Sequence, residues 1–125
     1  MSGRVVHGIS EPGFAAEIRS GDPLTLELRG SADIAASSTL GALLAGLHTE
    51  LVASAAQEVI VDMVQLEFMS ASAFNALVSW LGLVQELSPE RRYHMRFRSS
   101  DKILWQKRSL RTLSCFATDL IEIEG

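Results

Sequence analysis

The spacing of hydrophobic and polar positions predicts a hairpin near the start of the chain. Residues 14–19 and 24–29 are short runs with hydrophobic positions, and the turn formers of residues 20–23 separate them. In the second run, leucine alternates with polar residues, which predicts a strand with one face turned inward and its end at Gly30.

Two later segments carry the periodicity of helices. Leucines recur at intervals of three and four residues after Ser37 or Ser38, either of which is a suitable N-cap, and predict a helix to about Ser54. A second stripe predicts a helix that stops near Ser88 and Pro89; its members are Phe74, Leu77, Val78, Leu81 and Val84.

The remaining elements complete an alternating order. Residues 59–61 form a β-branched run that predicts a strand buried on both faces, with Asp62 at its end. Residues 93–98 and 120–124 predict two more strands, and residues 101–113 a third helix. This order predicts a single α/β domain, with a mixed, mostly parallel sheet of about five strands, an N-terminal antiparallel hairpin, and three to four helices on the faces of the sheet.

The segment between the central strand and the second helix resembles a known family. Phe-Met-Ser-Ala-Ser-Ala-Phe-Asn-Ala-Leu at residues 68–77 is similar to the aromatic residue and Asp-Ser-Ser-Gly-Leu-Gly motif of STAS domains. Gly-Ser-Ala-Asp at residues 30–33 resembles the Gly-x-Leu-Asp of that family, and residues 59–62 and 99–116 resemble its central strand and last helix. The resemblance covers residues 13–125, so residues 1–12 are expected to be an N-terminal extension.

The resemblance implies a regulatory site. STAS domains include the bacterial anti-sigma factor antagonists, in which a kinase phosphorylates the second serine of the motif; that serine corresponds to Ser72, with Ser70 as a second choice. Ser70 stands where the family has Asp, Ala71 replaces its first Ser, and Ala73 replaces its Gly. The implied partner surface includes the exposed side of the second helix and Ser31, Asp33, Ser70, Ala71, Ser72, Ala73 and Asn75.

The resemblance also implies protein partners. The expected partner is an anti-sigma factor that is a serine protein kinase of the histidine-kinase-like ATPase type, with a phosphatase as a further partner. The unmodified form would bind it and release a sigma factor, and phosphorylation would reverse this. Two alternatives within the family remain open: a STAS subunit of a membrane transporter complex, which docks without phosphorylation, and a member without any switch.

The chemistry of a helix start supports a switch at Ser72 independently of the family. The first turn presents backbone N–H groups without helical partners and the positive end of the helix dipole, so it tolerates a phosphate. Phosphorylation adds roughly −1.5 to −2 of charge and changes what can dock there. The plainer alternative is that Ser70 is an N-cap and Ser72 an ordinary first-turn residue.

Composition favours a cytoplasmic globular protein. The chain has 125 residues, 47% of them hydrophobic, and its single cysteine, Cys115, cannot form an internal disulfide. We expect Cys115 to be a small buried hydrophobe. Residues 1–13 lack an apolar run long enough for a signal peptide, so we expect none, and the uncharged stretches at 34–49 and 68–85 contain too many polar residues for membrane insertion.

Charge is uneven along the chain. The formal net charge is −4, yet residues 88–112 contain eight basic and two acidic residues. A nucleic-acid patch is one interpretation, with Trp105 available for stacking; its bases would be Arg96, Arg98, Lys102, Lys107, Arg108 and Arg111. The acidic balance of the whole chain argues against nucleic acid and favours a docking face for an acidic protein.

Motifs for catalysis are missing from the sequence. A small serine hydrolase using Ser72 is the least favoured alternative, because Gly-x-Ser-x-Gly is absent and the histidines fall in no motif, with His48 expected on the exposed side of the first helix. Without a phosphate loop or metal-ligand spacing, we expect no metal and no organic cofactor. Asp62 is expected to accept hydrogen bonds from loop N–H groups, and Asp33 to line the partner surface.

Overall fold

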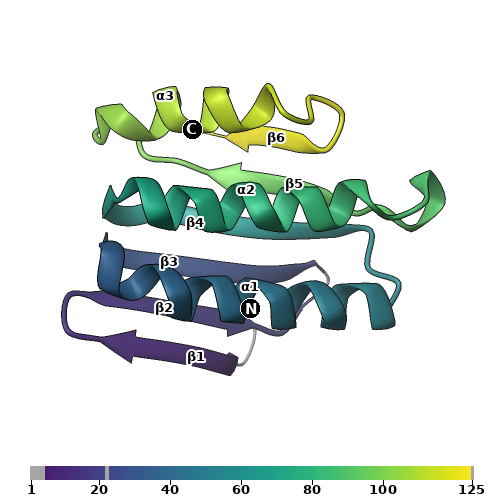
Figure 1. Ribbon diagram of the computed structural model, residues 1–125, viewed down its shortest axis with the longest axis horizontal. Coiled ribbons are helices and arrows are strands. Elements are labelled where there is room, and N and C mark those ends of the chain that lie inside the picture. Colours follow the sequence, from purple (N-terminus) through teal and green to yellow (C-terminus); the bar gives the residue numbers. More distant parts are fainter. Residues whose placement is uncertain (1–4, 22, 125) are drawn as a thin grey trace.

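Six strands form one sheet in the order in which they occur along the chain (Figure 1). The structure, a computed structural model, describes residues 5–21 and 23–124. The strands are β1 (Val5–Glu11), β2 (Phe14–Arg19), β3 (Leu24–Ala32), β4 (Glu58–Met69), β5 (His94–Arg98) and β6 (Ile121–Glu124). The pairs β1–β2 and β2–β3 are antiparallel, and β3–β4, β4–β5 and β5–β6 are parallel. The expected hairpin and mostly parallel mixed sheet are therefore confirmed.

Three helices connect the parallel strands, and all of them cover the same face of the sheet (Figure 1). They are α1 (Ile34–Ala53), α2 (Ala71–Gln85) and α3 (Leu104–Ser114); a short 3-10 helix, η1 (Pro89–Arg91), follows α2. Each parallel strand is added on the same side of the previous one, and crossovers are right-handed, so successive helices must lie on one face. The helices expected on the faces of the sheet therefore all lie on one face, and the other face is uncovered.

One core fills the space between the helices and the sheet. Inward positions of the strands alternate with outward ones, and they pack against the leucine stripe of α1, against α2, and against Leu110 and Leu113 of α3. The largest fully buried side chains include Trp80, Tyr93 and Phe97. Tyr93, directly before β5, contacts Trp80 of α2 and His48 of α1 through its hydroxyl.

The opposite face of the sheet carries charged side chains in cross-strand pairs. Arg29 pairs with Glu17 and Glu27, and Arg19 lies near the same two carboxylates. On the other side of β4, Arg96 pairs with Glu58 at 3.0 Å. Ile60 is only 7% exposed although no helix covers it, since Thr25 and Arg96 flank it in register. The opposite charges on neighbouring strands therefore neutralise one another across the uncovered face.

The turn that begins β2 fixes the path of β3. Gly30 has φ +85° and lies so close to the Gly13 carbonyl that a Cβ there would overlap the oxygen. The next amide, of Ser31, donates to that same carbonyl at 2.7 Å. Gly30 therefore does not end the strand as expected; β3 passes through it and continues to Ala32.

Several element boundaries differ from the expectation. Within residues 1–12, expected as an extension, the described residues include β1, which pairs with β2 and makes the sheet six-stranded. The helix α1 begins three residues before Ser37, with Asp33 as its N-cap. The strand β4 does not end at Asp62 but continues to Met69, with two register shifts against β3.

Candidate functional site

The carboxyl ends of β3 and β4 bring two predicted site segments together. The Ser70 amide, directly after β4, donates to the carbonyl of Ala32, the last residue of β3, at 2.8 Å. Asp33 follows Ala32, so the starts of α1 and α2 lie side by side at this edge of the sheet. Such an edge, where parallel strands end and helices begin, is the usual position for binding in α/β sheets.

Both helices at this edge begin with a side-chain cap. The Asp33 carboxylate accepts from the Ala36 amide at 3.0 Å, and the Ser70 hydroxyl accepts from the Ala73 amide at 3.1 Å. Each cap satisfies one of the N–H groups that a helix start leaves without a partner. Ser70 is half-buried and its oxygen is engaged in the cap, whereas Asp33 is exposed while capping.

Ser72 is an exposed residue in the first turn of α2. No hydrogen bond of its side chain, to a histidine or to any other group, is found among the described residues. The helix α2 has no acidic or basic residue anywhere in its length. A phosphate on Ser72 would therefore be the only charged group on this helix.

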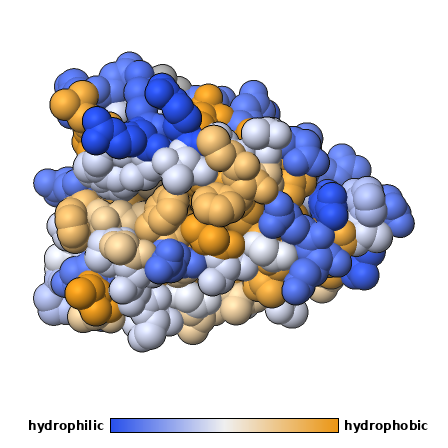
Figure 2. Space-filling view, turned by 45° about the horizontal axis from the view of Figure 1, so that its top comes forward, coloured by the Kyte–Doolittle hydropathy of each residue, from blue (hydrophilic) through white to orange (hydrophobic). Residues whose placement is uncertain are grey.

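The outer side of α2 is uncharged and partly apolar. Ser72, Asn75 and Ser79 are exposed along it, with half-buried Phe74 and Val78 beside them. A groove of about 220 Å³ runs between α1 and α2, lined by Gly41, Leu44, Ala45, Ala76, Ser79, Trp80 and Leu83. Figure 2 shows hydrophobic residues gathered across the middle of the helical side of the molecule. An uncharged outer side of this kind is typical of a contact surface rather than a solvated helix.

The other residues of the predicted partner surface are not equally accessible. Ala71 and Asn75 are exposed, and Ser31 is half-buried in β3. Ala73, in contrast, is 0% exposed and packs in the core. Its methyl group supports α2 from inside and is not available to a partner. Ile34 and Phe68, which were not predicted, are large exposed hydrophobic residues next to Asp33 and Met69 along the chain.

Two residues of α3 hold the end of β4 in place. Gln106, 0% exposed, donates from Nε2 to the carbonyls of Met63 and Leu66 at 2.6 and 2.8 Å, and its Oε1 accepts from the Ser100 amide. Trp105, which the nucleic-acid interpretation had available for stacking, donates from Nε1 to the Glu67 carbonyl at 2.7 Å. The sequence signal that was missed is a glutamine at a core-facing position, four residues before Leu110.

Two further expectations about single residues were wrong. His48 does not lie on the exposed side of α1: it is half-buried, and its Nδ1 is 2.7 Å from the Tyr93 hydroxyl. Cys115 is exposed rather than buried, because it follows the last turn of α3 on the side away from Leu113. Asp62 was expected to accept from loop N–H groups; its carboxylate accepts from the Val64 amide at 3.0 Å, and this amide lies within β4 rather than in a loop.

The basic residues of the nucleic-acid patch considered from the sequence lie on two different faces of the molecule. Arg96 and Arg98 lie on the uncovered face of the sheet, where glutamates of β4 and β6 pair with them. Lys107, Arg108 and Arg111 lie on α3, on the helical side. The sheet therefore separates the two groups, and they do not form one nucleic-acid patch.

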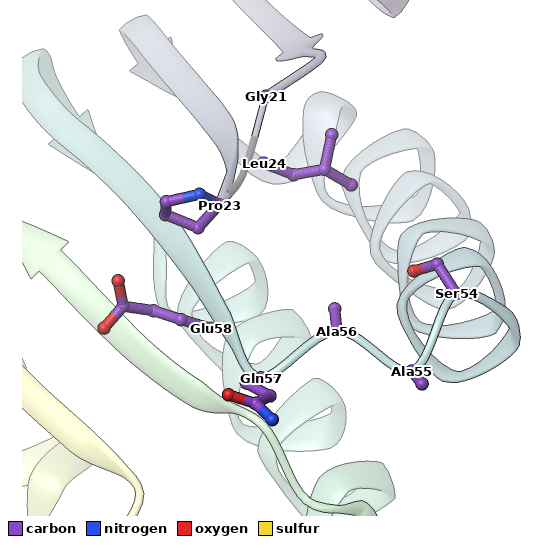
Figure 3. A pocket seen from close by; sticks show the side chains of 8 residues that line it. All are labelled: Gly21, Pro23, Leu24, Ser54, Ala55, Ala56, Gln57 and Glu58. Atoms are coloured by element: carbon purple, nitrogen blue, oxygen red, sulfur yellow. The ribbon is translucent and has the colours of Figure 1, made fainter.

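A hollow of about 390 Å³ lies at the other end of the sheet (Figure 3). It is lined by Gly21, Pro23, Leu24, Ser54, Ala55, Ala56, Gln57 and Glu58. In Figure 3 the Glu58 side chain points away from those of Ser54 and Gln57, so these polar side chains do not converge on one point. Among the described residues, no three His, Cys, Asp or Glu side chains are placed to hold a metal ion. Over the same residues, no helix combines the length and apolar character needed to cross a bilayer.

The fold is STAS-like. A crystal structure of an anti-sigma factor antagonist from Mycobacterium paratuberculosis superimposes on it with a TM-score of 0.63 over 91% of this chain and 90% of that chain. The two sequences are 14% identical, so the similarity is one of fold. No protein-family profile and no curated protein sequence matches the chain.

Proposed function

We propose that the chain is a non-enzymatic bacterial regulator of the anti-sigma factor antagonist type, acting in the cytoplasm. Its partner surface would comprise the start of α1 at Asp33, the first turn of α2, and the uncharged outer side of α2. The partner would be an anti-sigma factor that is a serine kinase of the histidine-kinase-like ATPase type, and a phosphatase would restore the unmodified form. The similarity of fold to an anti-sigma factor antagonist supports this choice of partner.

The observation that carries the proposal is the placement of Ser72. Its hydroxyl is exposed at the positive end of a helix that bears no charged side chain. A phosphate there would be stabilised by the helix start, so the fold would survive, while the contact surface would gain roughly −1.5 to −2 of charge. Phosphorylation would therefore control binding and leave the architecture intact.

Ser72 is a better phosphate acceptor than Ser70. The Ser70 hydroxyl accepts from the Ala73 amide and is half-buried, so a kinase would have to open the cap to reach it. Ser72 has no such engagement. Mass spectrometry of the chain after incubation with the candidate kinase and ATP should place the phosphate on Ser72, and the Ser72→Ala variant should remain unmodified.

Binding measurements test the switch itself. The wild-type chain should bind the candidate anti-sigma factor, and Ser72→Asp should weaken that binding about tenfold or more, because a charge would be placed in a desolvated contact. Ser88→Asp is the matched control: it adds the same charge at an exposed serine beyond the other end of α2, and its affinity should stay within about twofold of wild type. Equal affinity of Ser72→Asp and wild type would show that the charge switch is wrong and favour docking without phosphorylation.

A further inference from the structure

The exposed side of α3 is a second surface, separate from the one that contains Ser72. Residues 104, 107, 108 and 111 are spaced at three, four and seven positions and share one side of the helix. Leu104, Lys107, Arg108 and Arg111 are all exposed, while Gln106, Leu110 and Leu113 face the core. We call these four exposed residues the cationic face of α3; it is about 10 Å long from end to end.

The charges of this face are largely unpaired. Among the described residues, the only ion pair on it joins Lys107 to Asp101 at 2.7 Å, and neither Arg108 nor Arg111 has a carboxylate partner. The arginines of the uncovered sheet face differ, since Arg19, Arg29, Arg96 and Arg98 each have at least one glutamate partner. In the part of the chain that the structure describes, Arg108 and Arg111 thus belong to the cations without a carboxylate partner, together with Arg91, Arg92 and Lys102.

Exposed hydrophobic side chains lie at both ends of this cationic face. Leu104 is 85% exposed at the start of α3, and Phe116, directly after the helix end, is 54% exposed. In Figure 2, hydrophilic residues occupy the upper part of the helical side, with isolated hydrophobic residues among them. Leucine exposed to this degree beside unpaired arginines is the arrangement that a contact surface requires, with an apolar anchor and charges at its rim.

We propose that the cationic face of α3 binds an acidic protein segment that contains at least one hydrophobic residue to contact Leu104. Charge complementarity selects an acidic partner. A nucleic acid fits less well, because the indole of Trp105 is half-buried and bound to Glu67. This leaves Phe116, after the helix end, as the exposed ring for stacking, whereas successive bases stack on several rings. A membrane surface also fits less well, because Leu110 and Leu113 are buried in the core, so the exposed Leu104 and Phe116 stand at opposite ends of the helix without a continuous apolar face between them.

The test uses fluorescence anisotropy with defined probes on the full chain. The probes are a labelled peptide of glutamate and leucine, the same peptide with serine in place of leucine, and oligothymidylate of equal charge; sedimentation with phosphatidylserine vesicles covers the membrane. We expect the glutamate and leucine peptide to bind most tightly, with affinity that falls as salt is added. Tighter binding of oligothymidylate, or cosedimentation with vesicles but no peptide binding, would overturn the proposal.

Matched variants locate the interaction. Arg108→Glu and Leu104→Ser should each weaken peptide binding about fivefold, whereas Arg91→Glu, the same charge reversal at an exposed arginine of η1, should change it less than about twofold. Equal losses for Arg108→Glu and Arg91→Glu would mean that net charge alone drives binding and would overturn the proposal. Ser72→Asp should leave peptide affinity within about twofold of wild type. This result separates the α3 surface from the proposed anti-sigma factor surface, so either can fail alone.

Discussion

At the scale of single residues, the end of α1 contains a backbone conformation that alanine adopts at a cost. Ala55 has φ 53°, in the left-handed region. The Ala56 amide donates to the Leu51 carbonyl and the Ala55 amide to the Val52 carbonyl, which together form a Schellman motif. The left-handed position of this motif usually holds glycine, because a Cβ there is strained.

Ala55→Gly should therefore stabilise the protein by roughly 0.5–1 kcal/mol, since relief of backbone strain exceeds the added flexibility of the unfolded chain. Urea unfolding followed by circular dichroism measures the change. Ala45→Gly, at an exposed position inside α1, is the control and should lower the free energy of unfolding by about 1 kcal/mol. A loss of stability in both variants would show that Ala55 is not strained.

A second feature at this scale is a chain of three polar groups within the core. The Trp80 indole N–H donates to the Tyr93 hydroxyl at 2.8 Å, and that hydroxyl lies 2.7 Å from His48 Nδ1. Since indole can only donate, the tyrosine hydroxyl is free to donate to a neutral His48. Burial raises the pKa of Tyr93 to about 12, although the Trp80 hydrogen bond opposes this. Burial lowers the pKa of His48, and the Glu86 carboxylate opposes that shift.

The direction of the His48 shift predicts how stability depends on pH. Because the folded pKa lies below the unfolded value of 6.5, the unfolded chain binds the proton more readily. The free energy of unfolding should therefore fall as the pH drops from 6.5 through the folded pKa. Urea midpoints across this range measure it, and His48→Gln, which keeps an acceptor for Tyr93 but does not titrate, should have a flatter profile. An identical slope in both proteins would assign the effect to other groups.

At the scale of elements, β4 extends well beyond its neighbour β5. The two strands pair in register only over residues 58–62 of β4, so the carbonyls of Met63 and Leu66 have no strand partner on that side. Gln106 donates to both of them from α3. One amide side chain thus replaces the missing strand and fixes the position from which Ser70 and α2 begin.

Gln106→Leu should lower the free energy of unfolding by about 3 kcal/mol, because it leaves the two carbonyls and the Ser100 amide without partners in a buried position. Arg108→Gln, on the exposed side of the same helix, should change it by less than about 0.5 kcal/mol. Amide hydrogen exchange should also be faster at Ser100 in Gln106→Leu. Unchanged stability would mean that water replaces the glutamine without cost.

For the whole molecule, periodicity predicted the element types and their order but not which face the helices cover. The leucine stripe of α1 and the alternation in β3 are local signals that packing preserves. The uncovered face follows instead from the sequential order of strands, which no single segment reveals. The strand β4 was predicted too short because its two register shifts interrupt the period of two beyond Asp62.

Prediction of the site was limited for a similar reason. The exposed position of Ser72 at a helix start is local, and the sequence indicated it. The contact of Gln106 with Met63, which holds the end of β4, and the contact of His48 with Tyr93 in the core both join residues more than forty positions apart in the chain. Hydrogen bonds over such separations depend on the packed fold and leave no periodic trace in the sequence.

At the scale of the whole molecule, the question is whether residues 13–125 fold without the strand β1. Within residues 1–12, β1 is the edge strand of the sheet. Among its residues 8–11, Ile9 is the one hydrophobic side chain, and it packs partly buried against the core. We therefore expect a chain of residues 13–125 to fold with a free energy of unfolding lowered by about 1–2 kcal/mol. Glu17 and Arg19 on the newly exposed β2 should keep it monomeric in size-exclusion chromatography. Ile9→Ala in the full chain is the control for the side chain alone. Loss of a cooperative urea transition in the shortened chain would show that β1 is an integral part of the domain.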